Sequence, residues 1–356
     1  MKIGLCHNLY GGLSRGGAET AVALAAEELR RAGHEIFLIT TKPNAYAPDA
    51  ALDQDTYPVY YLESEYHNLD KHGSLFRLGW QIANIFSFKK YGQIKKILIS
   101  TKPDLVITHN LMGLGFLTPL ALRHLKIRQE HFLHDIQLLH PSGLMIWRQE
   151  KKLRGRSAKI YRSLTRALFG SPAKVLSPSK WLLQEYDKYG FFPASEKEIR
   201  PFAWPEAKVK KTVRTDKETR FLFIGQIEEQ KGVFLLIDAF RKTENPDFCL
   251  TFAIRGGGSG LVEAKRLAED DTRISFLGPL SYEETERIKI ESDYLVVPSL
   301  CYDNSPTVIY GAKAVNLPII ASNIGGIPEL LGPGDRLFSP GDVEGLRQKL
   351  KETSDK

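Results

Sequence analysis

Short apolar runs alternate with amphipathic stretches along most of this chain, a pattern typical of parallel strands connected by helices. The clearest example begins with an apolar run at Tyr294–Pro298, followed by a polar loop at Ser299–Ser305. A helical stretch then leads to a second apolar run at Leu317–Ala321 and to the glycine turn Gly325-Gly326. The pattern predicts strand, loop, helix, strand and glycine loop, in that order.

The start of the helix in this stretch is a candidate binding site. Ser305 stands where a helix cap is expected, and Pro306 stands at the first helical position. In an open parallel sheet, ligands bind where strands end and helices begin. The N–H groups of Thr307 and Val308 would therefore favour a phosphate. The same pattern also fits an ordinary strand–helix–strand unit without a ligand.

The chain opens in a similar way. A strand at Lys2–Asn8 is expected to run into the glycine loop GGLSRGGAE at residues 11–19, followed by a helix to about Ala32 and a strand at Glu35–Thr40. The glycine spacing is not GxGxxG, so the dinucleotide fingerprint is absent. Glycines and Arg15 ahead of a helix would still let the backbone approach a phosphate closely, although the loop alone also fits a flexible turn.

A length of 356 residues is too great for one typical core, and residues 200–219 have the proline and charge content of a linker. Before the linker, we expect further strands at Val59–Leu62, Leu105–Thr108, Gln129–Leu133 and Lys174–Ser177, and helices at 75–100, at 144–169 and after Ser179. Beyond it, we expect strands at Phe221–Gly225, Leu250–Ile254, Ile274–Leu277, Tyr294–Pro298 and Leu317–Ala321, and helices at 232–242, 260–269, 281–291, 306–315 and 342–352. We therefore predict an α/β fold of two Rossmann-like parallel-sheet domains, 1–203 and 204–356, facing across a cleft.

Charge is distributed unevenly between these two parts. Residues 1–203 contain 28 Lys+Arg and 18 Asp+Glu, a net charge of +10, whereas the remainder carries −3. Only the first part is therefore expected to meet an anionic surface. The expected helices at 75–100 and 144–169 have basic faces that could lie on an anionic membrane or simply face solvent. We find no recognised nucleic-acid-binding motif and expect no nucleic-acid partner.

The remaining composition indicates a cytoplasmic protein. The N-terminus leads straight into a strand without a signal peptide, and the apolar runs are too short to span a membrane. Cys6, Cys249 and Cys301 lie far apart and form no CxxC pair, which fits a reducing compartment and argues against a zinc site or a disulfide. We expect no bound metal.

Two histidines follow expected strands, His109 after Leu105–Thr108 and His134 after Gln129–Leu133. Strand ends line the ligand site of a parallel sheet, and imidazole titrates near neutral pH, so His134 and, with less weight, His109 are candidate functional residues. Either could also be a polar residue that only closes a strand.

The motifs, taken in order, resemble those of family 4 glycosyltransferases, which have the GT-B fold of two Rossmann-like domains. The matching segments are GGAE (16–19), LHDI (133–136), LSPSKW (176–181), FIGQIEEQKG (223–232), AIRGGGSG (253–260), ISFLGPLSYEE (274–284), DYLVVPS (293–299), CYDNSPTVIYGAKAVNLPIIAS (301–322) and GGIPEL (325–330). They span most of the chain.

The resemblance implies a retaining, metal-independent enzyme that binds a nucleoside diphosphate sugar as co-substrate in its second domain and an acceptor in its first, without a cofactor. Cationic side chains and helix N-termini would stabilise the charge that develops on the leaving diphosphate. The implied donor-binding residues are Gly16, Gly17, Lys231, Gly256, Gly258, Leu280, Asn304, Ser305, Pro306, Thr307 and Val308, with Arg15 as a further phosphate contact and His134 and Asp303 as the catalytic residues.

Two positions depart from the family pattern. The acidic pair Glu-x7-Glu is degenerate here, since its first position is Asp303 and its second is Gly311. The second Glu usually contacts the donor ribose, and the arginine usually paired with the phosphate-binding lysine is Gln226 here. Each lost charge-assisted contact could cost about 1.5–3 kcal/mol. Arg15 or Arg255 could replace the missing cation.

The expected function is transfer of a sugar from a nucleoside diphosphate sugar to a glycan or lipid-linked acceptor in cell-surface polysaccharide assembly. The basic first domain suggests an anionic acceptor and a peripheral contact with the inner face of the cell membrane. An alternative, motivated by Gly311 and Gln226, is a non-catalytic relative that binds a glycan, a nucleotide or a partner enzyme. A third reading, an epimerase or phosphorylase of the same fold, fits the order of motifs less well.

Overall fold

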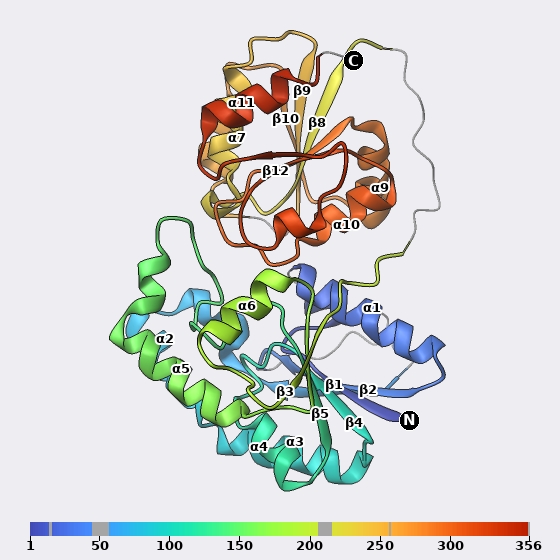
Figure 1. The fold of residues 1–356 in the computed structure, drawn as a ribbon, viewed down its shortest axis with the longest axis vertical. Coiled ribbons are helices and arrows are strands. Elements are labelled where there is room, and N and C mark those ends of the chain that lie inside the picture. Colours follow the sequence, from blue (N-terminus) through green and yellow to red (C-terminus); the bar gives the residue numbers. More distant parts are fainter. Residues whose placement is uncertain (14–15, 45–56, 206–215, 256–257, 355–356) are drawn as a thin grey trace. The chain divides into compact units, whose positions relative to one another are not determined.

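The computed structural model describes residues 1–13, 16–44, 57–205, 216–255 and 258–354 (Figure 1). Two compact units make up the chain. Unit 1 comprises Met1–Leu144 and Lys151–Ala203, and unit 2 comprises Met145–Glu150 and Trp204–Lys356. The short segment Met145–Glu150 thus belongs to the second unit, although it lies within the range 1–203.

Unit 1 contains a seven-stranded sheet in the order β3-β2-β1-β4-β5-β6-β7, with every neighbouring pair parallel. Its strands are β1 (Lys2–Cys6), β2 (Glu35–Lys42), β3 (Val59–Glu63), β4 (Leu105–Thr108), β5 (Arg128–Phe132), β6 (Lys174–Ser177) and β7 (Glu196–Ile199). The central strands are buried along nearly their whole length, as continuous apolar runs predict. The edge strand β7 escaped prediction because its sequence EKEI is mostly charged and exposed.

The helices of unit 1 are α1 (Gly17–Arg31), α2 (Ser74–Ile85), α3 (Phe88–Thr101), α4 (Thr118–His124), α5 (Arg156–Phe169) and α6 (Lys180–Lys188), with 3-10 turns at Gly11–Leu13, Glu65–Lys71 and Glu150–Arg154. The cap expected at Ser179 is confirmed, since its hydroxyl accepts from the Leu182 amide at 3.2 Å. The single helix expected at 75–100 is wrong, because the chain breaks it at Phe86 and Ser87. The helix expected from residue 144 is also wrong: it begins at Arg156, because the chain bridges Cys301 at Ile146, turns at residues 147–148 and then forms the 3-10 turn Glu150–Arg154.

Unit 2 contains a six-stranded parallel sheet in the order β10-β9-β8-β11-β12-β13 (Figure 1). Its strands are β8 (Thr219–Gly225), β9 (Phe248–Ile254), β10 (Ile274–Leu277), β11 (Tyr294–Val297), β12 (Ile319–Ser322) and β13 (Arg336–Phe338). Its helices are α7 (Val233–Arg241), α8 (Leu261–Ala268), α9 (Tyr282–Glu291), α10 (Thr307–Ala314) and α11 (Val343–Lys351), with 3-10 turns at Glu229–Lys231 and Ile327–Leu330. The expected helices and five of the six strands are confirmed within two residues at each end.

Successive residues of β8 point to opposite faces of the sheet, so Phe221 and Leu222 belong to different cores. On one face, α7, α8 and α11 cover a core rich in phenylalanine. On the other face, α9 and α10 cover a core of aliphatic residues. Because α9 and α10 share a face, side chains on these two helices can meet.

Candidate functional site

The centre of the candidate site in unit 2 is an ion pair between Lys231 and Asp303. The Lys231 Nζ lies 2.8 Å from Oδ1 and 3.0 Å from Oδ2 of Asp303. The Ser299 hydroxyl donates to the same carboxylate at 2.6 Å. The Lys231 side chain keeps 32% of its surface exposed and Asp303 keeps 19%, so this pair is partly buried but reachable from solvent.

The backbone brings these residues together through two tight approaches. Gly232 has a φ of 74°, and a Cβ atom there would lie 1.8 Å from the Pro298 carbonyl oxygen at the end of β11. Gly325 has a φ of 63°, and its Cβ would lie 2.4 Å from the Asp303 carbonyl oxygen. Only glycine fits both positions. The Gln230 carbonyl also accepts from the amides of Leu300 and Cys301 at 2.9 and 3.1 Å, which fixes the loop of Lys231 against that of Asp303.

The ion pair holds both partners charged at neutral pH. Burial alone would raise the pKa of Asp303, but the Lys231 ammonium and the hydrogen bonds from Lys231 and Ser299 lower this pKa below its usual value. Burial alone would lower the pKa of Lys231, but the charge of Asp303 raises this pKa above its usual value. Burial also raises the pKa of the neighbouring Cys301 thiol to about 12, so the thiol stays neutral.

The helix that follows, α10, begins one residue later than expected. Pro306 is the N-cap residue and Thr307 the first helical residue, so the expected cap at Ser305 is wrong. The Ser305 hydroxyl instead pairs with the Tyr310 hydroxyl at 2.8 Å, while Asn304 is buried beside it. The first N–H groups of α10, which include those of Thr307 and Val308, have no intrahelical acceptor and can receive an anion.

A further glycine loop lies at the carboxyl end of β9. Gly258 has a φ of 145°, and a Cβ atom there would lie 2.3 Å from the Ile227 carbonyl oxygen. The next residue, Ser259, donates to Glu228 from its amide and its hydroxyl at 2.7 and 2.8 Å. Leu280 is half-buried just before α9 and packs on the core of that face. Gly256 and Arg15 lie outside the described residues.

In unit 1, three histidines gather at the carboxyl edge of the sheet. His7 follows β1, His109 follows β4, and His134 lies two residues after β5. The Nδ1 of His109 is 2.8 Å from the Nε2 of His134, and the His7 ring lies 5.9 and 5.7 Å from the other two rings. His134 also stacks on Phe202 at 6.0 Å. His7 and His109 are buried and His134 is partly exposed, although its Nδ1 atom is buried and its Nε2 atom contacts His109.

Burial and the neighbouring imidazoles lower the pKa of both His109 and His134 well below the usual range. The direction of the shift is physically reasonable, because a desolvated cation close to other imidazoles is unfavourable. His134 is a neutral hydrogen-bonding group in this structure.

The residues after each histidine form a second pair. Asn110 donates to Asp135 at 3.0 Å, and the Gln137 amide donates to the same carboxylate at 2.7 Å. The Tyr186 hydroxyl donates to the Asp135 carbonyl at 2.9 Å. Burial raises the pKa of Asp135 to about 6. These contacts fix the backbone that carries His134.

The start of α1 lies near His7. Gly16 is the N-cap residue and Gly17 the first helical residue, and the Gly16 amide donates to the Glu19 carboxylate at 2.8 Å. The other oxygen of Glu19 lies 3.9 Å from His7 Nε2. The Gly16 amide is thus engaged by the chain itself.

The comparison with known sequences decides the family. Residues 15–200 match the profile described as Glycosyltransferase Family 4, and residues 206–355 match the profile described as Glycosyl transferases group 1. The first match covers more than half of the chain. The chain belongs to glycosyltransferase family 4.

Individual relatives agree with this assignment. The glycosyltransferase is 24% identical over 352 residues to an uncharacterized 42.6 kDa protein in the cps region of Klebsiella pneumoniae, covering 93% of this chain and 87% of the relative. It is 30% identical over 145 residues to the amylovoran biosynthesis glycosyltransferase AmsK of Erwinia amylovora, covering 38% and 36% of the two chains. The crystal structure of Anabaena Alr3699/HepE in complex with UDP-glucose superposes with a TM-score of 0.71 at 16% identity, covering 100% of this chain and 90% of that one. The fold is GT-B.

Gly311, where the resemblance leads one to expect the second acidic residue, lies buried in α10 against a lysine from α9. A Cβ atom at Gly311 would lie 2.7 Å from the Nζ of Lys289. Lys289 keeps only 4% of its side-chain surface exposed and pairs with Glu286 at 2.5 Å. The space of the missing side chain is therefore occupied by an ammonium group, with the carboxylate of Glu286 directly beyond it.

Several of these residues were not found from sequence. Ser299, Asn110 and Glu19 are polar residues that belong to no recognisable motif. Only the fold shows that they contact Asp303, Asp135 and His7, respectively. Lys289 lies at no position that the family pattern marks. Within the described residues, no group of three or more His, Cys, Asp or Glu side chains is arranged to hold a metal ion.

Proposed function

We propose that this glycosyltransferase moves a sugar, with retention of its anomeric configuration, from a nucleoside diphosphate sugar to a glycan or lipid-linked acceptor. We place the reaction in cell-surface polysaccharide assembly at the inner face of the cell membrane, without a metal or a cofactor. The observation that carries the proposal is the Lys231–Asp303 pair beside the start of α10.

The donor site in this proposal uses two sources of positive charge. The Lys231 ammonium and the first N–H groups of α10 both favour the diphosphate, which carries the negative charge of the donor. Asp303 holds the ammonium in place through two contacts and keeps it protonated. The Anabaena structure contains UDP-glucose, and this supports a nucleotide sugar as the donor.

The proposed reaction is a front-face displacement. The acceptor hydroxyl forms a bond to the anomeric carbon on the side from which the diphosphate leaves, and the bond between that carbon and the diphosphate oxygen breaks. The proton of the hydroxyl passes to the leaving diphosphate. Lys231 stabilises the charge that develops on the leaving group, because a fixed cation costs no reorganisation at that moment.

His134 would orient the sugar or the acceptor rather than supply a charge, since it is neutral in this structure. Its Nε2 is already engaged with His109, so the ring has a fixed orientation. The relative named for amylovoran biosynthesis supports a glycan product, and the basic first half of the chain supports an anionic acceptor.

The experiment is to incubate the purified protein with a panel of nucleoside diphosphate sugars and measure the free nucleoside diphosphate released, with and without a crude lipid acceptor fraction. We expect release from one donor, increased by the acceptor fraction and lost in Lys231→Met. Lys242→Met is the matched control, because Lys242 makes a similar ion pair with Asp238 at 2.9 Å on the exposed surface of α7.

The alternative of a non-catalytic binding protein is favoured by one observation, the ammonium of Lys289 in the space beside Gly311. It predicts that the folded protein turns over no donor.

For the transferase proposal, nucleotide release that persists undiminished in Lys231→Met would show that Lys231 is not part of the donor site.

A further inference from the structure

Helix α2 carries a stripe of large apolar side chains that face solvent. Leu75, Leu78, Ile82 and Phe86 recur at helical spacing along one face, each between 42% and 87% exposed. Six of the thirteen exposed large apolar residues in the described part of the chain fall between residues 75 and 88. A soluble surface rarely concentrates such residues without a binding role. We call the four residues the α2 stripe.

The opposite face of α2 is fixed to unit 1. The Gly113 amide donates to the Asn84 side chain at 2.8 Å, and Trp80 stacks on Tyr66 at 6.1 Å. The helix is therefore held by its buried face, and the α2 stripe points away from the core to which the helix is attached.

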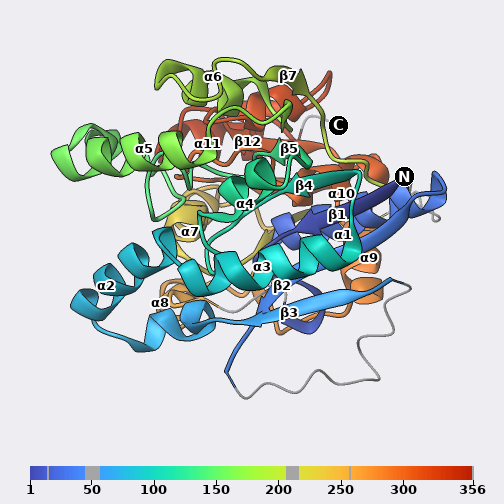
Figure 2. The same cartoon turned by 90° about the horizontal axis from the view of Figure 1, so that it is seen from below.

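The chain segment that carries the stripe is basic, although Glu63 and Glu65 lie nearby. From Lys71 to Pro103 the chain contains seven Lys and Arg residues and no Asp or Glu. Figure 2 shows α2 beyond one end of the edge strand β3, and α3 turning back from α2. An apolar helix face bordered by cations is the pattern of a helix that lies in the interface of an anionic membrane.

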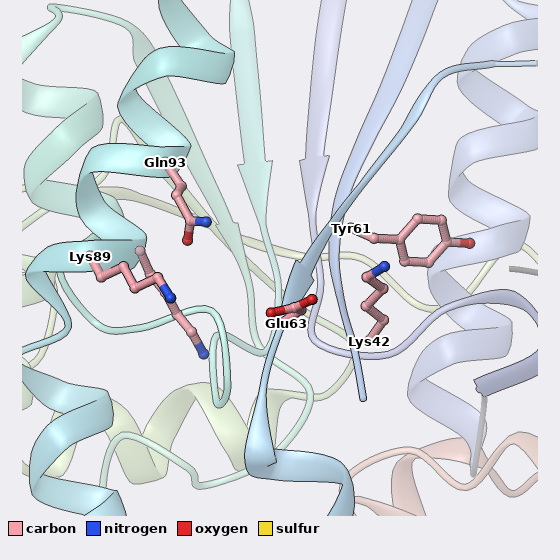
Figure 3. Close-up of a pocket in the computed structure, with 6 residues that line it drawn as sticks. Lys42, Tyr61, Glu63, Lys89 and Gln93 are labelled. Carbon is pink, nitrogen blue, oxygen red and sulfur yellow. The ribbon is translucent and has the colours of Figure 1, made fainter. Parts of the chain in front are cut away.

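A hollow lined by lysines lies next to this segment. It measures about 350 Å³ and is lined by Lys42, Tyr61, Glu63, Lys89, Lys90 and Gln93. Figure 3 shows Lys42, Tyr61 and Glu63 on the strand side and Lys89 and Gln93 on helix α3. Three lysines against one carboxylate leave the hollow net positive, so it suits an anion of phosphate size. We call it the lysine pocket.

The first turn of α3, which borders the pocket, carries cations where acidic residues are normally favourable. Lys89 and Lys90 lie in its first turn, which contains no acidic residue, and the N-cap Ser87 makes no side-chain cap. Cations are unfavourable at this positive end of a helix dipole. Burial and the nearby Lys89 also lower the pKa of Lys90 to about 8. A bound anion would relieve both costs, and local rule-breaking of this kind is expected where a ligand binds.

The pocket lies on the functional edge of the sheet. Lys42 ends β2 and Glu63 ends β3, and all strands of this sheet are parallel, so both residues lie on the same edge as His134. Three strand spacings separate β2 from β5, which is roughly 14 Å.

We propose that the α2 stripe and the lysine pocket form one membrane-docking surface, in which the stripe enters the interface of an anionic bilayer and the pocket holds a lipid phosphate. This deepens the proposed function, on which it rests for the statement that the acceptor is lipid-linked. A second copy of the chain is a poor occupant, because two such basic faces repel each other. A bilayer supplies both the apolar layer and the dense negative charge that this surface matches.

The test is co-sedimentation of the protein with vesicles of phosphatidylcholine alone or mixed with phosphatidylglycerol, at about 50 mM and about 500 mM salt. We expect binding to the anionic vesicles that weakens at high salt. Leu78→Ser/Ile82→Ser should lower the affinity at least about tenfold. Lys42→Gln/Lys89→Gln should lower it roughly 25-fold and flatten the salt dependence, at about fivefold for each lysine.

Matched controls use exposed residues far from this surface. Val262→Ser removes an apolar side chain that is 82% exposed in unit 2, and Lys126→Gln removes a charge just before β5, at the opposite edge of the sheet of unit 1. Neither should change vesicle binding. Circular dichroism checks that every variant is folded.

Three results would overturn the proposal. The wild type fails to bind anionic vesicles at low salt, both surface variants bind these vesicles as tightly as the wild type, or the wild type forms a dimer that the Leu78→Ser/Ile82→Ser substitutions dissociate. Inorganic phosphate that competes fully with vesicles would show a free anion site instead of a lipid site. Nucleotide release is measured separately, so a protein that binds vesicles but turns over no donor disproves the proposed function and leaves the docking surface standing.

Discussion

Replacing Lys231 by methionine tests whether the ion pair with Asp303 stabilises unit 2 as well as serving the donor. The variant keeps most of the side-chain volume but removes the ammonium that donates to Asp303. The partly buried Asp303 carboxylate then keeps the hydrogen bond from the Ser299 hydroxyl. At 2.8 Å and an effective dielectric of 20, the attraction between two unit charges is about 6 kcal/mol. Desolvation offsets much of this, and Lys231 is about one third exposed, so we expect a net loss of about 2–3 kcal/mol.

The matched comparison is Lys242→Met, whose ion pair with Asp238 has nearly the same length but lies on the surface. Its loss should be at most about 1 kcal/mol, because exposed pairs contribute little. Since the two units need not unfold together, the free energy is best measured by hydrogen exchange of β11 and α10 peptides in increasing urea. A double-mutant cycle with Asp303→Asn should give a coupling of at least 1 kcal/mol.

The pH dependence gives a second check on the same pair. The pKa of Asp303 is lowered in the fold, so its contribution is present above the unfolded value near 4 and disappears as pH falls through the folded value. The pKa of Lys231 is raised, so its contribution is present below about 10.4 and disappears as pH rises through the folded value. The cost of Lys231→Met should thus be constant between about pH 5 and 9. A cost no larger than that of Lys242→Met, or a coupling near zero, would refute the reasoning.

Three further predictions follow from other groups. Gly311→Glu should leave donor affinity within about twofold, because the new carboxylate pairs with Lys289, whereas Gly311→Glu/Lys289→Met should raise it about tenfold, as measured by calorimetry with the donor that is turned over. Between about pH 4 and 6, Asp135 is protonated in the folded protein and ionised in the unfolded chain. As pH rises through this range, the free energy of unfolding should therefore fall by roughly 2–3 kcal/mol, and it should stay level above about pH 6. Asp135→Asn should abolish this pH dependence in urea unfolding. His109→Leu should lower transfer about fivefold through loss of the His134 hydrogen bond, whereas His124→Leu on the surface should not, in a nucleotide-release assay.

Glycines made much of unit 2 predictable from sequence. Gly232 and Gly325 occupy turns where a side chain would collide with backbone, so their positions in the chain mark where loops must approach each other. The short apolar runs likewise predicted every strand of unit 2 except β13, because parallel strands are buried on both faces.

Local pattern failed where a distant segment decided the conformation. Residues 145–150 follow no strand pattern, yet Trp147 donates to the Leu300 carbonyl and the Tyr302 amide donates to the Met145 carbonyl, both at 2.8 Å. The Trp147 ring also fills the space over Gly341, where a Cβ atom would lie 2.2 Å from it. A helix was expected there because the neighbouring residues are helical, but the backbone hydrogen bonds are made with unit 2 instead.

The surroundings of Gly311 show the same division between what sequence and structure reveal. The sequence shows that residue 311 is a glycine, but it does not show which group lies beside it. The structure places the Lys289 ammonium from α9 beside Gly311, and this ammonium pairs with Glu286. A Cβ atom at Gly311 would meet the flexible end of Lys289 at 2.7 Å, which can move, whereas a Cβ atom at Gly232 would meet the Pro298 backbone carbonyl at 1.8 Å, which cannot. Comparing Gly311→Glu with Gly311→Glu/Lys289→Met therefore separates the effect of a carboxylate at residue 311 from the effect of the Lys289 ammonium beside it.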